Sequence, residues 1–215
     1  MEALNRRPLK TRSAAWAGAT ARGLAKLGFT PNLVSVIGVL IAVGGATALV
    51  FAGQADGLQR GVLLGVGALC IQLRLLCNML DGLIAVECGL KGKLGDLFNE
   101  VPDRIEDSVL LLGAGFAAMS PVGVTLGWTA ALFAVVTAYL RVLGGSLGFA
   151  QDFCGPMAKQ HRMFFLTLAC LLGAGEVRFS DQRLIMVGFL GVIIVGAGLT
   201  SVRRLIRIGR QLQNR

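Results

Sequence analysis

Apolar positions dominate this chain in long runs that short polar breaks separate. Each run holds about twenty residues, the length that a helix needs to cross a hydrocarbon layer ~30 Å thick. The pattern predicts six transmembrane helices, at 31–53, 60–88, 97–119, 122–147, 161–176 and 184–209. The fifth is the shortest, because His161 and Arg162 lie at one of its ends and Glu176 at the other.

A shorter amphipathic pattern precedes these runs, at residues 9–27. One helical face of this segment carries Leu9, Trp16, Leu24 and Leu27, with the small Ser13 and Thr20 between them. Arg22 and Lys26 lie elsewhere, which predicts a helix in the membrane interface. Thr30-Pro31-Asn32 then supplies a capping hydroxyl and a first-turn proline for the first span. We expect one membrane domain over 1–215, with 9–27 interfacial and 31–209 forming a six-helix bundle.

Composition agrees with an all-α integral membrane protein. The chain is 54% hydrophobic, holds 30 glycines and is only 15% charged, whereas soluble domains are usually ~45–50% apolar. The cysteines lack the Cys-x-x-Cys spacing of zinc or redox sites, so we expect free thiols.

The net charge of +9 fits nucleic acid, anionic lipid or phosphate-bearing substrates as partners. Position decides among these, because the basic residues flank the apolar runs. They are Arg6, Arg7, Lys10, Arg12, Arg22 and Lys26 before the first span, and Arg203, Arg204, Arg207, Arg210 and Arg215 after the last. This arrangement predicts a multi-pass protein of the inner or plasma membrane that contacts anionic lipids, with both termini cytoplasmic, rather than a nucleic-acid binder.

Ionisable side chains within the second and third spans need a partner or a function, because each costs ~2.5–3.5 kcal/mol on insertion. At about 100° per residue, Arg74, Asn78, Asp81 and Ala85 share one face. The next helix aligns Asp96, Asn99, Asp103 and Glu106, with Asp107 at the edge of the face. The glycine-rich connection between the spans lets these faces close on a cavity whose oxygen ligands suit hard divalent cations. The alternative is a polar seam between helices, with salt bridges such as Arg74 to Asp81.

The spacing of these residues resembles the signature of the CDP-alcohol phosphotransferases, Asp-x2-Asp-Gly-x2-Ala-Arg-x8-Gly-x3-Asp-x3-Asp. The matching positions are Asp81, Gly82, Ala85, Gly95 and Asp103. The chain departs from the signature at Asn78 and Asn99, where the family has its first and third aspartates, and at Val86, where it has arginine.

The resemblance implies transfer of a phospho-alcohol group from a CDP-linked lipid donor to an alcohol acceptor, with release of CMP in phospholipid biosynthesis. Asp103 would be the general base, and Mg²⁺ or Mn²⁺, as one or two ions, would be the cofactor. Candidate metal ligands are Asp81, Asn78, Asn99 and Asp103. Because asparagine adds no charge, nearby acids would compensate: Asp96, Glu100 and Glu106, and less well Glu87.

The resemblance also implies a set of substrate-binding residues: Gly82, Ala85, Gly95, Arg74 and Asn32, and for donor or acceptor phosphates Arg141, Lys159 and Arg162. Positive-inside flanking charge is the alternative for the last two. The sequence does not select the acceptor.

Two further functions compete with this one. A degenerate relative would bind a CDP-lipid or a protein without chemistry, as the three replaced signature positions favour, although retained Asp81 and Asp103 argue against it. A small transporter would spread its polar residues across the bilayer, whereas here they cluster at one side. Small-residue pairs within the spans suit either internal packing or a homodimer.

Overall fold

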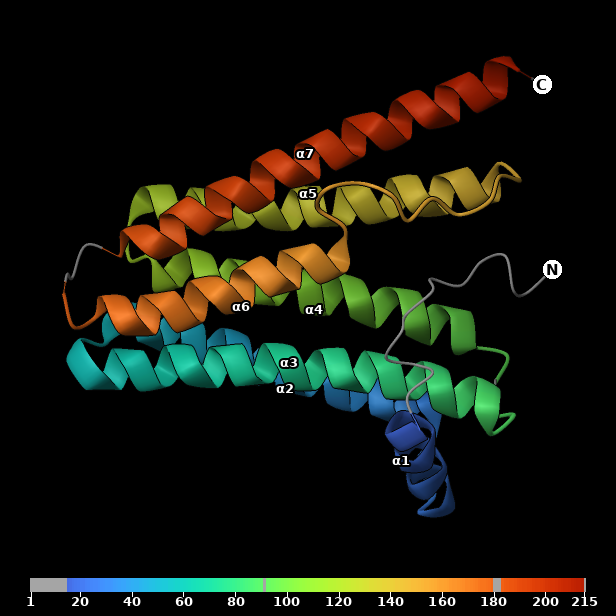
Figure 1. Ribbon diagram of the computed structural model, residues 1–215, viewed down its shortest axis with the longest axis horizontal. Coiled ribbons are helices and arrows are strands. Elements are labelled where there is room, and N and C mark those ends of the chain that lie inside the picture. The colour runs from blue at the N-terminus through green and yellow to red at the C-terminus, as the bar shows by residue number, and fades with distance from the viewer. Residues whose placement is uncertain (1–14, 91, 180–182, 215) are drawn as a thin grey trace.

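The computed structural model describes residues 15–90, 92–179 and 183–214, and all regular secondary structure in that part of the chain is α-helical (Figure 1). Its helices are α1 (Ala15–Lys26), α2 (Pro31–Gln54), α3 (Gly57–Glu87), α4 (Gly95–Ala117), α5 (Pro121–Ser146), α6 (Lys159–Glu176) and α7 (Leu184–Gln213). Helices α2 to α7 form a bundle. Helix α1 crosses the bundle near the end at which α3 leads into α4, and it contacts α3 (Figure 1).

The helix limits agree with the predicted ranges to within a few residues. Residues 9–14 of the predicted interfacial helix lie outside the described part of the chain, as do Arg6, Arg7 and Arg215. The predicted start at Thr30 is confirmed, since its hydroxyl accepts a hydrogen bond of 3.3 Å from the Leu33 N–H. Ser120 caps α5 in the same way, at 3.0 Å from the Gly123 nitrogen. In both cases a proline occupies the first turn, where its missing N–H costs nothing.

Among the described residues, four helices are long and apolar enough to span a membrane: α2, α3, α5 and α7. The prediction of six spans is therefore supported only in part. Helix α4 carries acidic residues through its first half, and α6 is only 18 residues long and begins at Lys159. Both nevertheless lie within the bundle, where α4 contacts α2 and α5, and α6 contacts α3 and α7 (Figure 1).

Small residues bring the helices into close contact inside one molecule. A Cβ added at Gly113 of α4 would lie 2.8 Å from the Ala46 carbonyl oxygen of α2. Likewise, a Cβ at Gly115 would lie 2.9 Å from the Gly127 Cα of α5. Internal packing therefore accounts for these glycines, and a homodimer stays a prediction.

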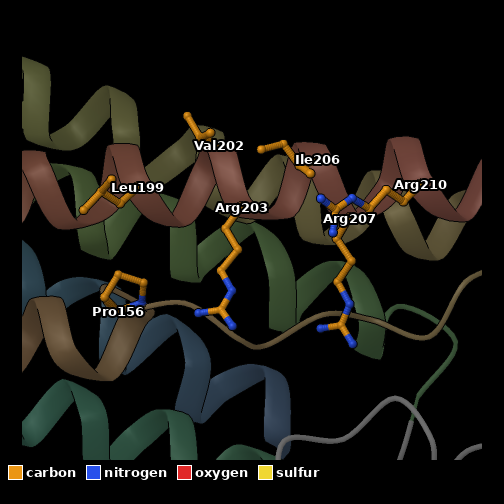
Figure 2. Close-up of a pocket in the computed structure, with 7 residues that line it drawn as sticks. All are labelled: Pro156, Leu199, Val202, Arg203, Ile206, Arg207 and Arg210. Carbon is orange, nitrogen blue, oxygen red and sulfur yellow. The ribbon is translucent and has the colours of Figure 1, made fainter.

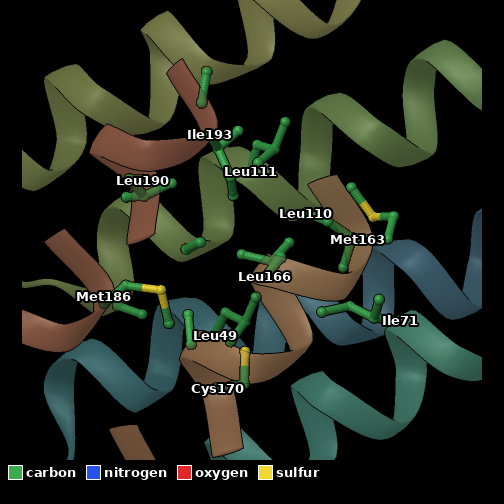
Figure 3. Packing of buried hydrophobic residues seen from close by; sticks show 14 of the residues in the cluster. Leu49, Ile71, Leu110, Leu111, Met163, Leu166, Cys170, Met186, Leu190 and Ile193 are labelled. Atoms are coloured by element: carbon green, nitrogen blue, oxygen red, sulfur yellow. The ribbon is translucent and has the colours of Figure 1, made fainter. Parts of the chain in front are cut away.

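The apolar core lies at the centre of the bundle and draws on all six of its helices. The larger side chains shown in Figure 3 include Leu49, Ile71, Leu111, Leu166 and Leu190, each fully buried. On the outside, large apolar side chains such as Leu40, Leu132 and Val195 are about two-thirds exposed, at 66%, 64% and 64%. A bundle with apolar side chains on both its inside and its outside is typical of a protein surrounded by lipid.

Candidate active site

The polar faces predicted on α3 and α4 do meet, and Arg74 joins them. This side chain is fully buried, and its Nη1 donates to Glu106 Oε2 at 3.1 Å. Its Nη2 donates to Asp107. The predicted alternative of a salt bridge from Arg74 to Asp81 is wrong, because Arg74 pairs with the two acids of α4 instead. Gly38 of α2 leaves room for Glu106, since a Cβ there would lie 2.7 Å from Glu106 Oε1.

Asn78 lies at the centre of this cluster and uses both ends of its amide. Its Oδ1 accepts hydrogen bonds from Arg74 Nη1 at 2.9 Å and from Lys159 Nζ at 2.7 Å. Its Nδ2 donates to Glu106 Oε2 at 3.1 Å. The amide therefore accepts from two cations and donates to one carboxylate. An ionised aspartate at this position would have no N–H to donate to Glu106 and would add a negative charge.

Lys159, the first residue of α6, reaches into the cluster between α3 and α4. Besides Asn78, its ammonium contacts Asp103 Oδ1 of α4. Both side chains are largely buried, with 20% of Lys159 and 18% of Asp103 exposed. The structure thus joins residues 78, 103 and 159, three candidates named from the sequence.

Arg162, one turn after Lys159, completes the cluster from the opposite side. Its Nη2 donates to Asp107 Oδ2 at 2.7 Å, and its Nη1 donates to Thr137 Oγ1 of α5 at 3.0 Å. Asp107, predicted to lie at the edge of its face, is therefore the residue through which Arg74 and Arg162 are joined.

Asp81 lies apart from these ion pairs. Ser35 of α2 donates to its Oδ2 at 2.7 Å, while Oδ1 is buried and has no hydrogen-bond partner among the described residues. Ser35 could not be identified as a partner of Asp81 from the sequence, because a hydroxyl in a transmembrane helix usually donates to a carbonyl of the preceding turn. The Ser35 hydroxyl also lies within hydrogen-bond distance of the Pro31 carbonyl.

The acids predicted to compensate for the asparagines are paired with cations of the chain. Glu87 lies 3.5 Å from Arg22. Glu100 accepts two hydrogen bonds from Arg141 Nη2, at 2.7 and 2.6 Å, and also contacts Arg104. Asp96 and Asn99 are exposed near the start of α4, and four other candidates are half-buried: Asn32, Gly82, Ala85 and Gly95.

These donors do not fit a pair of divalent cations. Within the described ranges, no three His, Cys, Asp or Glu side chains gather as a metal site would require. Asn78 and Asp103 already bind Lys159, and Glu106 already binds Arg74. Among the signature positions, Asp81 alone keeps a buried carboxylate oxygen without a described partner.

A groove on α7 was not predicted. It has a volume of about 640 Å³ and is lined by Pro156, Leu199, Val202, Arg203, Ile206, Arg207 and Arg210. Figure 2 shows Arg203 and Arg207 extending from α7 toward the segment that precedes α6. The groove thus combines an apolar wall with guanidinium groups.

The connection before α6 is fixed to α7 through Asp152 and Cys154. Arg207 Nη1 donates to Asp152 Oδ2 at 3.1 Å, and Arg204 Nε donates to the Cys154 carbonyl at 3.1 Å. Burial alone would raise the pKa of Asp152, but the hydrogen bond from Cys154 and the charge of Arg207 outweigh it, so that its pKa lies below the ordinary value. From the sequence, Arg204 and Arg207 were assigned only to flanking charge.

Comparison with known proteins gives several similar chains, although no protein-family model matches this one. Phosphatidylinositol phosphate synthase of Mycobacterium marinum is 27% identical over 196 residues, covering 89% of this chain and 76% of that protein. The Mycobacterium tuberculosis synthase is 33% identical over 93 residues, which are 43% of this chain and 39% of that synthase. The latter match thus spans well under half the length of the relative.

Solved structures show the same fold. The M. tuberculosis phosphatidylinositol phosphate synthase with CDP-DAG bound is 25% identical, with a TM-score of 0.72 over 91% of this chain and 94% of that one. A second structure of that synthase, in complex with manganese and citrate, is 24% identical with a TM-score of 0.72, over 89% of this chain and 88% of that one.

Proposed function

We propose that this chain is a membrane enzyme of the CDP-alcohol phosphotransferase family, which transfers a phosphatidyl group from a CDP-linked lipid to an alcohol and releases CMP. The observation that carries the proposal is the similarity, over 91% of the chain, to a synthase whose structure holds CDP-DAG. The signature residues add support, because Asn78 and Asp103 are joined through Lys159 at one end of the bundle.

Asp103 is the base in this proposal. The acceptor hydroxyl oxygen attacks the phosphorus that carries the lipid, the P–O bond to the CMP phosphate breaks, and the hydroxyl proton passes to Asp103. Lys159 binds Asp103 Oδ1, so the other carboxylate oxygen is assigned to the acceptor. Lys159, whose side chain is 20% exposed, adds positive charge where the donor diphosphate would lie, whereas Arg74 and Arg162 are buried in ion pairs with Glu106 and Asp107. A divalent cation, Mg²⁺ or Mn²⁺, would be held by Asp81, the one signature residue that keeps a buried carboxylate oxygen without a described partner.

The acceptor is proposed to be an alcohol that carries its own phosphate, such as inositol phosphate. The two mycobacterial relatives described above are named phosphatidylinositol phosphate synthases. The groove on α7 supports this choice, because the planar guanidinium group of Arg203 in its lining matches phosphate oxygens in pairs. Arg207 and Arg141 are less suited, since Arg207 already binds Asp152 and Arg141 already binds Glu100 and Gln151.

We further propose that α4 and α6 complete six spans, with α1 in the membrane interface. Trp16 of α1 is 54% exposed, and Leu27, which directly follows the helix, is 76% exposed, which suits contact with lipid at the headgroup level. The end of the bundle that bears Asp81 and Asp103 would face the cytoplasm. Helix α1 and the last turns of α7, rich in arginine, lie toward this same end (Figure 1).

A binding function without chemistry is the second candidate. It is favoured by one observation, the direct pairing of Asp103 with Lys159, because the ammonium already occupies one of the two carboxylate oxygens that could take the acceptor proton. Such a protein would hold the CDP-lipid but leave it intact.

One assay separates the two candidates. Purified protein in detergent is incubated with CDP-diacylglycerol and a panel of alcohols that includes inositol phosphate, and CMP release is measured. We expect release with a phosphorylated alcohol, and its loss in Asp103→Asn, by about 10²-fold or more. The matched control is Asp56→Asn at the far end of the bundle, where the side chain is 81% exposed. If the protein binds CDP-diacylglycerol but releases no CMP with any acceptor, the proposed enzyme is wrong and the binding function is supported.

A further inference from the structure

The ammonium group of Lys159 lies between the first and fourth positions of the signature. It contacts Asn78 Oδ1 at 2.7 Å and Asp103 Oδ1. Lys159 comes from α6, and both partners come from other helices, so this contact depends on the tertiary fold rather than on local sequence. A positive charge of the chain itself is thus inserted between two residues whose oxygens could otherwise share an added cation.

The charges of the cluster balance without any added ion. Its cations are Arg74, Lys159 and Arg162, and its anions are Asp103, Glu106 and Asp107. Every one of these six has an ion-pair partner within the set. The buried carboxylate of Asp81 lies outside these ion pairs. A divalent cation between Asn78 and Asp103 would bring two positive charges next to the ammonium of Lys159, in a set whose own charges already balance, and like charges in a buried site repel strongly.

Asn78 fits the same arrangement. An aspartate at this position would add a negative charge and would lack the N–H donor that Asn78 gives to Glu106 at 3.1 Å. A neutral amide near a resident ammonium, and a carboxylate near a divalent ion, are therefore two alternative solutions to the same charge balance.

We infer that Lys159 is the built-in cation of this site, holding the position between Asn78 and Asp103 from which divalent ions are excluded. The inference deepens the proposed function, on which its catalytic meaning rests: the ammonium supplies positive charge toward the donor diphosphate. Its structural content, the exclusion of a cation from this position, holds for either candidate function.

Direct titration of Mn²⁺ tests the inference without turnover. The wild type and the double variant Lys159→Met with Asn78→Asp are titrated in detergent, and free Mn²⁺ is followed by electron paramagnetic resonance. The double variant exchanges the ammonium for an apolar chain and restores an acid. We expect it to bind one Mn²⁺ per chain more than the wild type, or to bind at least about tenfold more tightly. Lys93→Met, at an exposed lysine between α3 and α4, should leave the titration unchanged.

Two results would overturn the inference. One is equal Mn²⁺ stoichiometry and affinity in the wild type and the double variant. The other is Mn²⁺ binding by the wild type that disappears in Asp103→Asn, which would place an ion where Lys159 is assigned. If the double variant fails to fold, Lys159→Gln alone takes its place, and we expect a smaller gain in Mn²⁺ binding over the wild type. Because no step of the titration depends on CMP release, failure here is distinct from failure of the proposed enzyme.

Discussion

Removal of the buried arginine at the centre of the cluster has a calculable cost. In Arg74→Met the new side chain keeps much of the apolar volume, but Glu106 loses its cation. Glu106 is fully buried and would keep only the 3.1 Å hydrogen bond from Asn78, whereas Asp107 would still pair with Arg162 at 2.7 Å. Loss of one partner from a buried pair costs about 3–5 kcal/mol, because the remaining charge is uncompensated.

The second substitution in the cycle removes that remaining charge. Glu106→Gln in the Arg74→Met background should recover part of the loss, with a coupling energy of about 2–3 kcal/mol. The free energy of unfolding is measured by SDS titration in mixed micelles, followed by circular dichroism. The control is Arg104→Met, whose ion pair with Glu100 is partly exposed, at 23% and 30% of the two side chains, and which should cost about 0–1 kcal/mol. A cost for Arg74→Met no larger than that of Arg104→Met, or no recovery in the double variant, would refute the reasoning.

Two further predictions concern packing and the connection before α6. Gly113→Ala should destabilise the protein by about 1–3 kcal/mol, because its Cβ would overlap the Ala46 backbone. Gly44→Ala, where the added Cβ meets nothing within 4 Å, should instead stabilise it by up to about 1 kcal/mol. The same SDS titration compares the two variants, and equal effects would contradict the close approach of α2 and α4. The pKa of Asp152 is lowered in the folded state, so its contribution to stability is present above its ordinary pKa of 3.8 and is lost as pH falls through the folded value. Wild type should therefore be more stable than Asp152→Asn at pH 7, with the difference shrinking below about pH 4, and a difference that does not change with pH would disprove the assignment.

The parts of the site that lie on one helix could be predicted from the sequence. The spacing of Arg74, Asn78 and Asp81 fixes their common face once the helix is assumed, since the helical repeat sets their directions. For the same reason Asp103 and Glu106 were expected on one face of α4. Pro31 and Thr30 fixed the start of α2 through local capping alone.

The partners of these residues could not be predicted, because they are set by tertiary packing. Lys159 is 81 residues from Asn78 in sequence. Its position depends on where the irregular connection that ends at Ala158 places the first turn of α6 in the bundle. Asp107 lies at the edge of its face by helical angle, yet cations from α3 and α6 approach it from two sides. The spacing indicates which side chains share a face but not which residues approach that face from other helices.

The amide at position 78, where the resemblance to the family signature implies an aspartate, can be explained by its neighbours. A residue that decays without constraint has no reason to keep its acceptor oxygen and its donor correctly placed, yet Asn78 Oδ1 accepts from Arg74 and Lys159 and Nδ2 donates to Glu106. An aspartate here would place its carboxylate beside that of Glu106 and lose this donor bond, and like charges at hydrogen-bond distance in a buried site repel strongly. The substitution and the inward position of Lys159 are therefore coupled, because the neutral amide is the residue that lets one lysine, rather than an added ion, balance Asp103.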